Sequence, residues 1–167
     1  IPSDVSFSAV GGVFRGAGSG TAKVMGRMVS LAHLWNTVRV QGGDYGTGMI
    51  LRDIGFAGFF SYRDPSAART LDCCRASADF LRGVAETDLT GMIIGAAAES
   101  EPLLTARMKG KTADARYWRQ ITHDDLCRVR REMLSATPDD LTALADSVGE
   151  LAAQGAVCVL GPRQQVD

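Results

Sequence analysis

The sequence has 167 residues, of which 46% are apolar and 22% are charged, and its formal net charge at neutral pH is −1. This length suits one domain with a packed core, and the moderate charge content excludes an intrinsically disordered chain. Proteins that bind nucleic acid or anionic membrane surfaces need an excess of basic residues, which this sequence lacks. We therefore expect neither nucleic acid nor a membrane among its partners.

The apolar runs, the chain start and the cysteines indicate what kind of protein and compartment to expect. No apolar run approaches the roughly 18 residues that span a bilayer. Residues 1–4 include no initiating methionine and no basic leader, so we interpret the chain as a piece of a longer protein. The four cysteines are Cys73, Cys74, Cys127 and Cys158. They form no Cys-x-x-Cys pair and are typical of reduced thiols, which favours a cytoplasmic location.

The first part of the chain predicts a strand, a helix and a hairpin. Residues 5–10 alternate apolar and polar side chains, as a half-buried strand does. After a glycine-rich break, residues 21–38 predict a helix. Residues 47–52 and 55–62 predict two strands joined by a tight turn, which makes an antiparallel hairpin. The buried stripe of the helix is expected to consist of Val24, Met28, Leu31 and Trp35.

The second part of the chain predicts mainly helices. Asp64 followed by Pro65 is typical of a helix start, with Asp64 as the N-cap. The buried stripe of that helix is expected to be Leu71, Cys74, Ala78 and Leu81. A helix over 88–99 should follow, then a stretch over 100–120 that is mostly loop with a helical part near Tyr117. Further helices should begin after Thr122 and Thr137, and a closing strand should cover 156–160.

This order of elements predicts the fold class. A strand, a helix, a hairpin, several helices and a last strand are typical of an α+β domain. We expect a two-layer sandwich in which helices pack on one face of a largely antiparallel sheet. Residues 1–167 should form a single domain without an internal linker.

Several chemical motifs can be tested against their required spacing. The glycine cluster at 16–20 precedes a helix, but Lys23 lies too far along for a phosphate-binding loop. The two histidines, His33 and His123, are far apart in sequence and occur in neither H-E-x-x-H nor H-x-x-E-H. No G-x-S-x-G nucleophile elbow is present. The sequence therefore predicts no metal site and no nucleophile of its own.

One segment carries side chains that suit the binding of an extended peptide. Arg39 and Tyr45 flank the pair Gly42-Gly43, which ends the predicted helix. A guanidinium can donate to peptide carbonyls, and a phenol can donate to a developing oxyanion. Arginine and tyrosine in a loop are also commonly structural, so this pattern alone leaves both interpretations open.

The same segment resembles a known family. Residues 35–46 read WNTVRVQGGDYG and are similar to the R-V-x-G-G-x-Y-G signature in the last domain of presequence proteases, which are inverted-zincin metallopeptidases related to pitrilysin. The resemblance continues in order over nearly the whole chain. Its further segments are 59–65, 70–71, 79–81, 94–95, 109–110, 130–134, Thr137 and 157–161.

The resemblance implies a role within a larger enzyme. It implies that this is the last α+β domain of a multi-domain zinc endopeptidase, with the zinc and its H-x-x-E-H motif in the catalytic half of the parent protein. The partners would be the other domains of the same polypeptide and peptide substrates. Arg39 and Tyr45 would contact the substrate backbone and its oxyanion, with Gly42 and Gly43 forming the loop between them. No cofactor would bind this chain, which alone would be inactive.

An alternative stays open, and the sequence departs from the family pattern in places. The chain could instead be a non-catalytic peptide-binding or assembly module of a degenerate peptidase. Asp44 stands where a small residue is usual, and Cys73-Cys74 stand where an aromatic-rich helix is common. These departures bear on substrate preference rather than on family membership.

Overall fold

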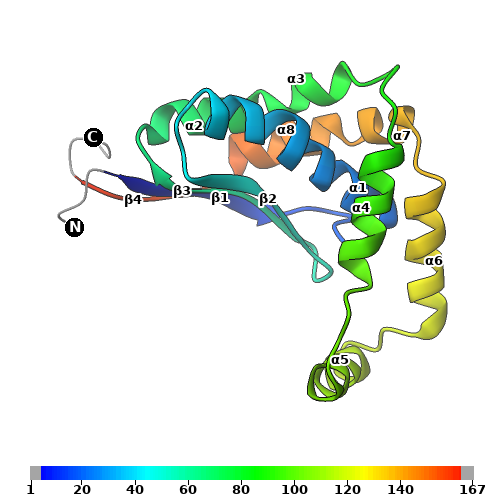
Figure 1. The fold of residues 1–167 in the computed structure, drawn as a ribbon. Helices are drawn as coiled ribbons and strands as arrows, with labels where there is room; N and C mark the ends of the chain where they lie inside the picture. The colour runs from blue at the N-terminus through cyan, green and yellow to red at the C-terminus, as the bar shows by residue number, and fades with distance from the viewer. Residues whose placement is uncertain (1–4, 163–167) are drawn as a thin grey trace.

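The computed structural model describes residues 5–162. Four strands form one antiparallel sheet in the order β2-β3-β1-β4. Figure 1 shows α2, α3 and α8 lying above one face of this sheet, while α4 and α6 lie beyond its right-hand end and α5 stands below them. The expected two-layer α+β fold is therefore confirmed. The strands are β1 (Ser6–Val13), β2 (Gly46–Arg52), β3 (Phe56–Asp64) and β4 (Ala156–Leu160).

The helical layer is made of short elements. They are α1 (Gly20–Met28), η1 (Val29–Val40), α2 (Ala67–Arg75), α3 (Ser77–Arg82), α4 (Thr90–Ser100), α5 (Ala106–Trp118), α6 (His123–Leu134), α7 (Pro138–Ala143) and α8 (Ala145–Gln154). Two of the expected helix starts are confirmed in detail. Thr122 and Thr137 each form a capping box, with Asp125 and Asp140 respectively.

The core lies between the sheet and the helices. Alternate residues of the strands point toward the helical layer, so that Val10 and Phe59 are almost fully buried. Side chains from the helices fill the space opposite them. The largest of these fully buried residues are Met25, Leu34, Leu81, Met133, Leu141, Val24, Val29, Val38 and Val148.

The hairpin that precedes α2 is formed as predicted. β2 and β3 pair in register from Gly46 opposite Tyr62 to Arg52 opposite Phe56. The turn uses Gly55 with φ of +82°, a left-handed conformation that glycine adopts without strain. Phe56, Phe60 and Tyr62 lie on one face of β3, as expected, and they are on the side away from the core.

The long helix predicted over 21–38 changes its geometry halfway. α1 ends at Met28 and continues as the π-helix η1, in which the Gln41 amide donates to the carbonyl of Asn36, five residues back. The wider turn shifts the buried face, which in η1 consists of Val29, His33, Leu34 and Val38. The expectation that Leu31 and Trp35 are buried was wrong, because they are 39% and 40% exposed.

Two other expectations were also wrong. Residues 106–118 form the helix α5 rather than mostly loop, and none of its residues is buried. An apolar stripe is what reveals a helix in a sequence, and a helix without a buried face does not need one. Asp64 is not the N-cap of α2, which starts at Ala67 with Ser66 as its cap residue. Asp64 instead ends β3 and is fully buried.

Candidate substrate-binding site

Arg39 lies in the last turn of η1. Its guanidinium carbon is 3.9 Å from the centre of the Trp35 ring, one turn earlier on the same helix. No carboxylate within residues 5–162 forms an ion pair with Arg39. Trp35 therefore supports the guanidinium from one side and leaves its N–H groups able to donate to another molecule.

Tyr45 follows the end of η1 and precedes β2. Its side chain is 57% exposed. The ring centre is 5.5 Å from that of Tyr62, and the guanidinium of Arg63 lies 5.4 Å from the ring centre of Tyr45. The ring is thus held between two neighbours from the end of β3. Within the described part of the chain, no group hydrogen-bonds the Tyr45 hydroxyl, so the phenol can donate to a ligand.

The Gly42-Gly43 pair makes the turn that joins Arg39 to Tyr45. A Cβ on Gly42 would overlap the carbonyl oxygen of Val38, so no larger residue fits without a backbone shift. Gly43 has φ of +86°, and its amide donates to the carbonyl of Arg39 over 3.0 Å. The chain therefore folds directly back after η1, and the two glycines keep Arg39 and Tyr45 on the same loop.

Arg69 of α2 holds this turn from the side. Its guanidinium donates to the carbonyl of Gln41 over 2.9 Å and to that of Thr37 over 3.4 Å. These carbonyls belong to the end of a helix, where backbone acceptors lack helical partners. Sequence reasoning missed Arg69, because its partners are backbone atoms and no motif marks them.

Two buried carboxyl groups lie beneath the same loop. Asp44 is 5% exposed and Asp64 is fully buried. Thr70 donates to Asp44 over 3.4 Å, Ser61 donates to Asp64 over 2.8 Å, and the Ser66 amide also donates to Asp64. Burial, and secondly repulsion from Asp64, raise the pKa of Asp44 from its ordinary 3.8 to about 7.

The raised pKa of Asp44 predicts how stability depends on pH. Between pH 3.8 and about 7 the folded chain holds a proton that the unfolded chain has lost, so this group makes unfolding easier as pH rises. We expect Asp44→Asn to remove that decline, and urea unfolding at pH 5 and pH 8 would measure it. The exposed carboxylate Asp53, replaced in Asp53→Asn, is the control. An equal decline in wild type and Asp44→Asn would contradict this prediction.

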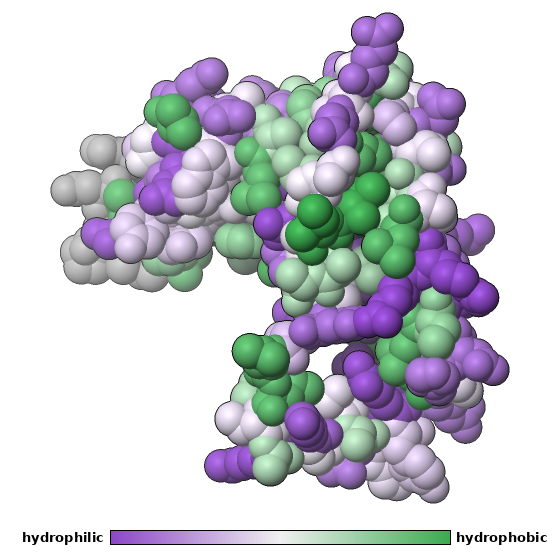
Figure 2. Space-filling model, turned by 45° about the vertical axis from the view of Figure 1, so that its right-hand side comes forward, coloured by the Kyte–Doolittle hydropathy of each residue, from purple (hydrophilic) through white to green (hydrophobic). Residues whose placement is uncertain are grey.

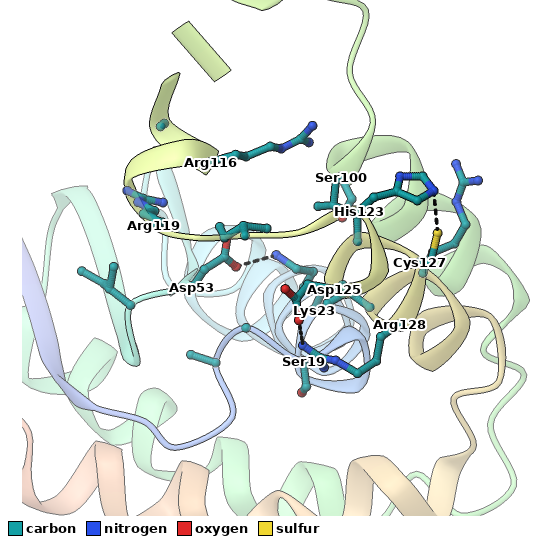
Figure 3. A pocket seen from close by; sticks show the side chains of 18 of the residues that line it. Ser19, Lys23, Asp53, Ser100, Arg116, Arg119, His123, Asp125, Cys127 and Arg128 are labelled. Atoms are coloured by element: carbon teal, nitrogen blue, oxygen red, sulfur yellow. Dashed lines mark hydrogen bonds and ion pairs between the residues drawn. The ribbon is translucent and has the colours of Figure 1, made fainter. Parts of the chain in front are cut away.

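A separate cavity of about 1190 Å³ lies between α5, α6 and the loop that precedes α1. Figure 2 shows the lobe that contains α5 standing apart from the main body, with a hollow between them. Figure 3 shows its polar wall, where Lys23 pairs with Asp53 over 3.1 Å. Neither Arg39 nor Tyr45 lines this cavity.

The start of α1 and one face of α6 form part of this cavity wall. The Gly20 amide, at the start of α1, donates to the carboxylate of Glu132 over 2.7 Å. A side-chain carboxylate thus binds the N-terminal amide of α1, where the helix dipole favours negative charge. His123 and Cys127 lie one turn apart on α6, and the His123 Nε2 atom is 3.3 Å from the Cys127 Sγ atom (Figure 3). This contact was not anticipated from the sequence.

The described residues do not fit a zinc ion. Within 5–162, no three side chains of histidine, cysteine, aspartate or glutamate are grouped closely enough to bind a metal. His33 packs its ring on Phe80 and contacts the carbonyl of Cys73 over 2.9 Å. Burial raises the pKa of the Cys74 thiol to about 12, so this thiol stays protonated and is a poor nucleophile.

Nearly the whole chain is similar to one part of several longer proteins. The sequence model described as the PreP C-terminal domain matches residues 1–160. The chain belongs to this family. It is 29% identical over 98% of its length to the protein HypA of Clostridium perfringens, and 30% identical over its whole length to presequence protease 1, chloroplastic/mitochondrial, of Arabidopsis thaliana. It spans only 17% and 16% of these two relatives.

Solved structures agree on the fold of this PreP C-terminal domain. Pitrilysin matches with a TM-score of 0.66 at 16% identity, over 95% of this chain and 18% of pitrilysin. An inactive peptidase domain of a putative zinc protease from Bordetella parapertussis matches with a TM-score of 0.64 at 12% identity, over 95% of this chain and 93% of that one. The fold is therefore that of the pitrilysin-like zinc protease domains.

Proposed function

We propose that this PreP C-terminal domain contributes Arg39 and Tyr45 to the active site of a zinc-dependent endopeptidase, whose metal is held by other domains of the same polypeptide. The observation that carries this proposal is the Arg39–Tyr45 loop, in which a side chain on Gly42 would overlap the Val38 carbonyl and Gly43 adopts a left-handed conformation. Trp35 packs against the Arg39 guanidinium, and Tyr62 and Arg63 pack against the Tyr45 ring. The guanidinium N–H groups and the phenol hydroxyl can therefore donate to a ligand. A loop that served only to connect η1 to β2 would not need this arrangement.

The roles of the two residues follow from their donor groups. Arg39, supported by Trp35 at 3.9 Å, would donate to backbone carbonyls of an extended peptide. Tyr45 would donate its hydroxyl proton to the scissile carbonyl oxygen as that oxygen becomes an oxyanion. Zinc, when bound in the catalytic half of the parent protein, would activate the water that attacks the peptide. The chain on its own would hold no metal and cleave nothing.

The partners and the compartment follow from the same proposal. The partners are the remaining domains of the parent polypeptide and its peptide substrates. None of the helices within 5–162 has both the length and the apolarity that crossing a membrane requires. All four cysteines are free thiols, which keeps a reducing, cytoplasmic type of compartment as our expectation, although relatives carry mitochondrial and chloroplastic in their names.

A second function is favoured by one observation. The Bordetella neighbour that this chain matches over most of its length is described as inactive. A peptide-binding or assembly module of a degenerate peptidase would keep the same fold. The parent reading frame distinguishes the two, because an upstream H-x-x-E-H is required for the first function and is dispensable for the second.

Arg39→Lys in the parent enzyme tests the binding role. Lysine keeps the charge but loses the planar fork, so we expect KM for a peptide substrate to rise about 10-fold or more, the value of one charge-assisted hydrogen bond. Steady-state kinetics with a quenched fluorescent peptide would measure this. Arg107→Lys, on the exposed helix α5, is the matched control and should leave KM unchanged. An unchanged KM in Arg39→Lys would remove Arg39 from substrate binding.

A further inference from the structure

The loop that carries Tyr45 rests on a buried polar cluster that the proposed function does not use. Asp44 directly precedes Tyr45, and Asp64 directly follows Arg63, whose guanidinium packs on the Tyr45 ring. Both carboxyl groups are buried, with 5% and 0% exposure. Asp44 is therefore the neighbour of Tyr45 in the chain, and Asp64 is the neighbour of the residue whose guanidinium packs on the Tyr45 ring.

Hydrogen-bond donors are distributed unequally between the two carboxyl groups. Asp64 accepts from the Ser66 amide over 2.7 Å, from Ser61 over 2.8 Å and from Ser8 over 3.3 Å. Asp44 accepts a long bond of 3.4 Å from Thr70. A buried carboxylate needs several donors to replace water, and Asp64 has them while Asp44 does not.

The Ser61 hydroxyl is shared between the two carboxyl groups. It favours the ionised form of Asp44, but it donates to Asp64 over 2.8 Å and lies 2.7 Å from the hydroxyl of Ser8. An ionised Asp44 would be buried beside Asp64 with few donors of its own. Burial and the long bond from Thr70 thus favour a neutral acid at Asp44.

We propose that Asp44 is a positioning residue for Tyr45, held as a neutral acid beside the Asp64 carboxylate, and that its ionisation displaces the Tyr45 loop. The proposal rests on the proposed function for its catalytic consequence, but the structural coupling stands without it. Ionisation of Asp44 places a second negative charge near Asp64, and both neighbours of Asp44 in the chain, Gly43 and Tyr45, are exposed. The pKa of Asp44, raised to about 7, puts this change near neutral pH.

Other charged groups around Asp44 do not cancel this repulsion. From α2, Arg69 attracts Asp44, but its guanidinium is exposed and bonded to the carbonyls of Gln41 and Thr37. Cys74, also from α2, stays a neutral thiol. From η1, the charge of Arg39 lies over Trp35. Asp64, from the end of β3, is therefore the dominant charged neighbour.

NMR titration of the chain 1–167 tests the coupling directly. We expect the ring signals of Tyr45 to shift between pH 5 and pH 9 with the same midpoint as the Asp44 carboxyl carbon. Asp44→Asn should abolish that shift and keep Tyr45 at its low-pH position. Asp64→Asn should move the midpoint of Asp44 to lower pH, because the like charge is gone. Asp53→Asn, which changes an exposed carboxylate, should alter neither signal.

Two results would overturn the proposal. One is a Tyr45 signal that stays constant while the Asp44 carboxyl titrates; the other is a Tyr45 shift that persists in Asp44→Asn. If Asp44→Asn does not fold, the wild-type titration decides alone, and a Tyr45 signal that does not share the midpoint of the Asp44 carboxyl refutes the coupling.

The catalytic consequence is measured separately in the parent enzyme. Asp44→Asn should move the alkaline limb of the pH profile of kcat/KM upward, while Asp53→Asn leaves it in place. A profile that is unchanged, although the NMR coupling is present, would count against the role of Tyr45 in the reaction and not against the coupling.

Discussion

Tyr45→Phe in the complete enzyme is expected to lower kcat about 100- to 1000-fold with little change in KM, the usual effect of removing one oxyanion donor. The phenol is the group at stake, since phenylalanine keeps the ring between Tyr62 and Arg63 and loses only the hydroxyl. An interaction made only in the transition state changes kcat and kcat/KM equally. Steady-state kinetics on one peptide substrate would measure both parameters.

The control for this prediction is another exposed tyrosine. Tyr117 on α5 is 75% exposed and far from the loop in sequence, so Tyr117→Phe should retain the wild-type kcat. If Tyr45→Phe also retained the wild-type kcat, Tyr45 would have no part in the reaction. If it raised KM alone, Tyr45 would bind substrate without stabilising the oxyanion.

Gly42→Ala is expected to lower the free energy of unfolding by about 1–3 kcal/mol, the range seen when a side chain is forced into filled space. The added Cβ would overlap the carbonyl oxygen of Val38, and it would also lie 3.3 Å from the Arg69 guanidinium that holds the turn. The Val38 carbonyl is backbone of η1 and cannot rotate away as a side chain can, so the turn itself must move. Urea denaturation of the chain, followed by far-UV circular dichroism, would measure the loss.

Gly110→Ala should change stability in the opposite direction. Gly110 lies inside α5 and has nothing within 4 Å of the position of an added Cβ. Alanine in an open helical position is favoured over glycine by about 1 kcal/mol. If Gly42→Ala proved as stable as wild type, the tight turn described for residues 41–45 would be wrong.

The sheet and its connections could be predicted from the sequence, because strands and hairpins leave local signals. Alternating apolar residues marked β1, and the turn at Gly55 marked the hairpin. The helix starts at Thr122 and Thr137 were marked by capping boxes. Each of these features is encoded within a few residues, so one sequence is enough to reveal it.

Features that depend on contacts between distant residues were missed or misplaced. The change to π-helical geometry after Met28 moved Trp35 to the surface, where it supports Arg39, and no period in the sequence announces that change. Helix α5 has no buried face and therefore no stripe. Asp64 looked like a helix cap because Pro65 follows it, whereas the serines that donate to it include Ser8 of β1, which is distant in sequence.

The candidate site also contains some residues that a local motif indicated and others that only distant contacts reveal. Arg39, Tyr45 and the two glycines were found from a short motif, and the structure places the glycines at the turn that joins the two side chains. Arg69 and Asp44 were not assigned roles, since Arg69 donates to backbone carbonyls and the buried Asp44 accepts from Thr70, 26 residues away in sequence. Supporting residues of this kind become visible only in three dimensions.

The central claim is that this domain completes an active site whose zinc lies elsewhere in the polypeptide. The most direct test compares zinc content and peptide cleavage for the parent enzyme, for the parent lacking this domain and for the chain 1–167 alone. We predict that the parent binds zinc and cleaves, that the shortened parent binds zinc with cleavage lost, and that the chain alone does neither. Zinc-dependent cleavage by purified 1–167, or full activity in the shortened parent, would contradict the claim.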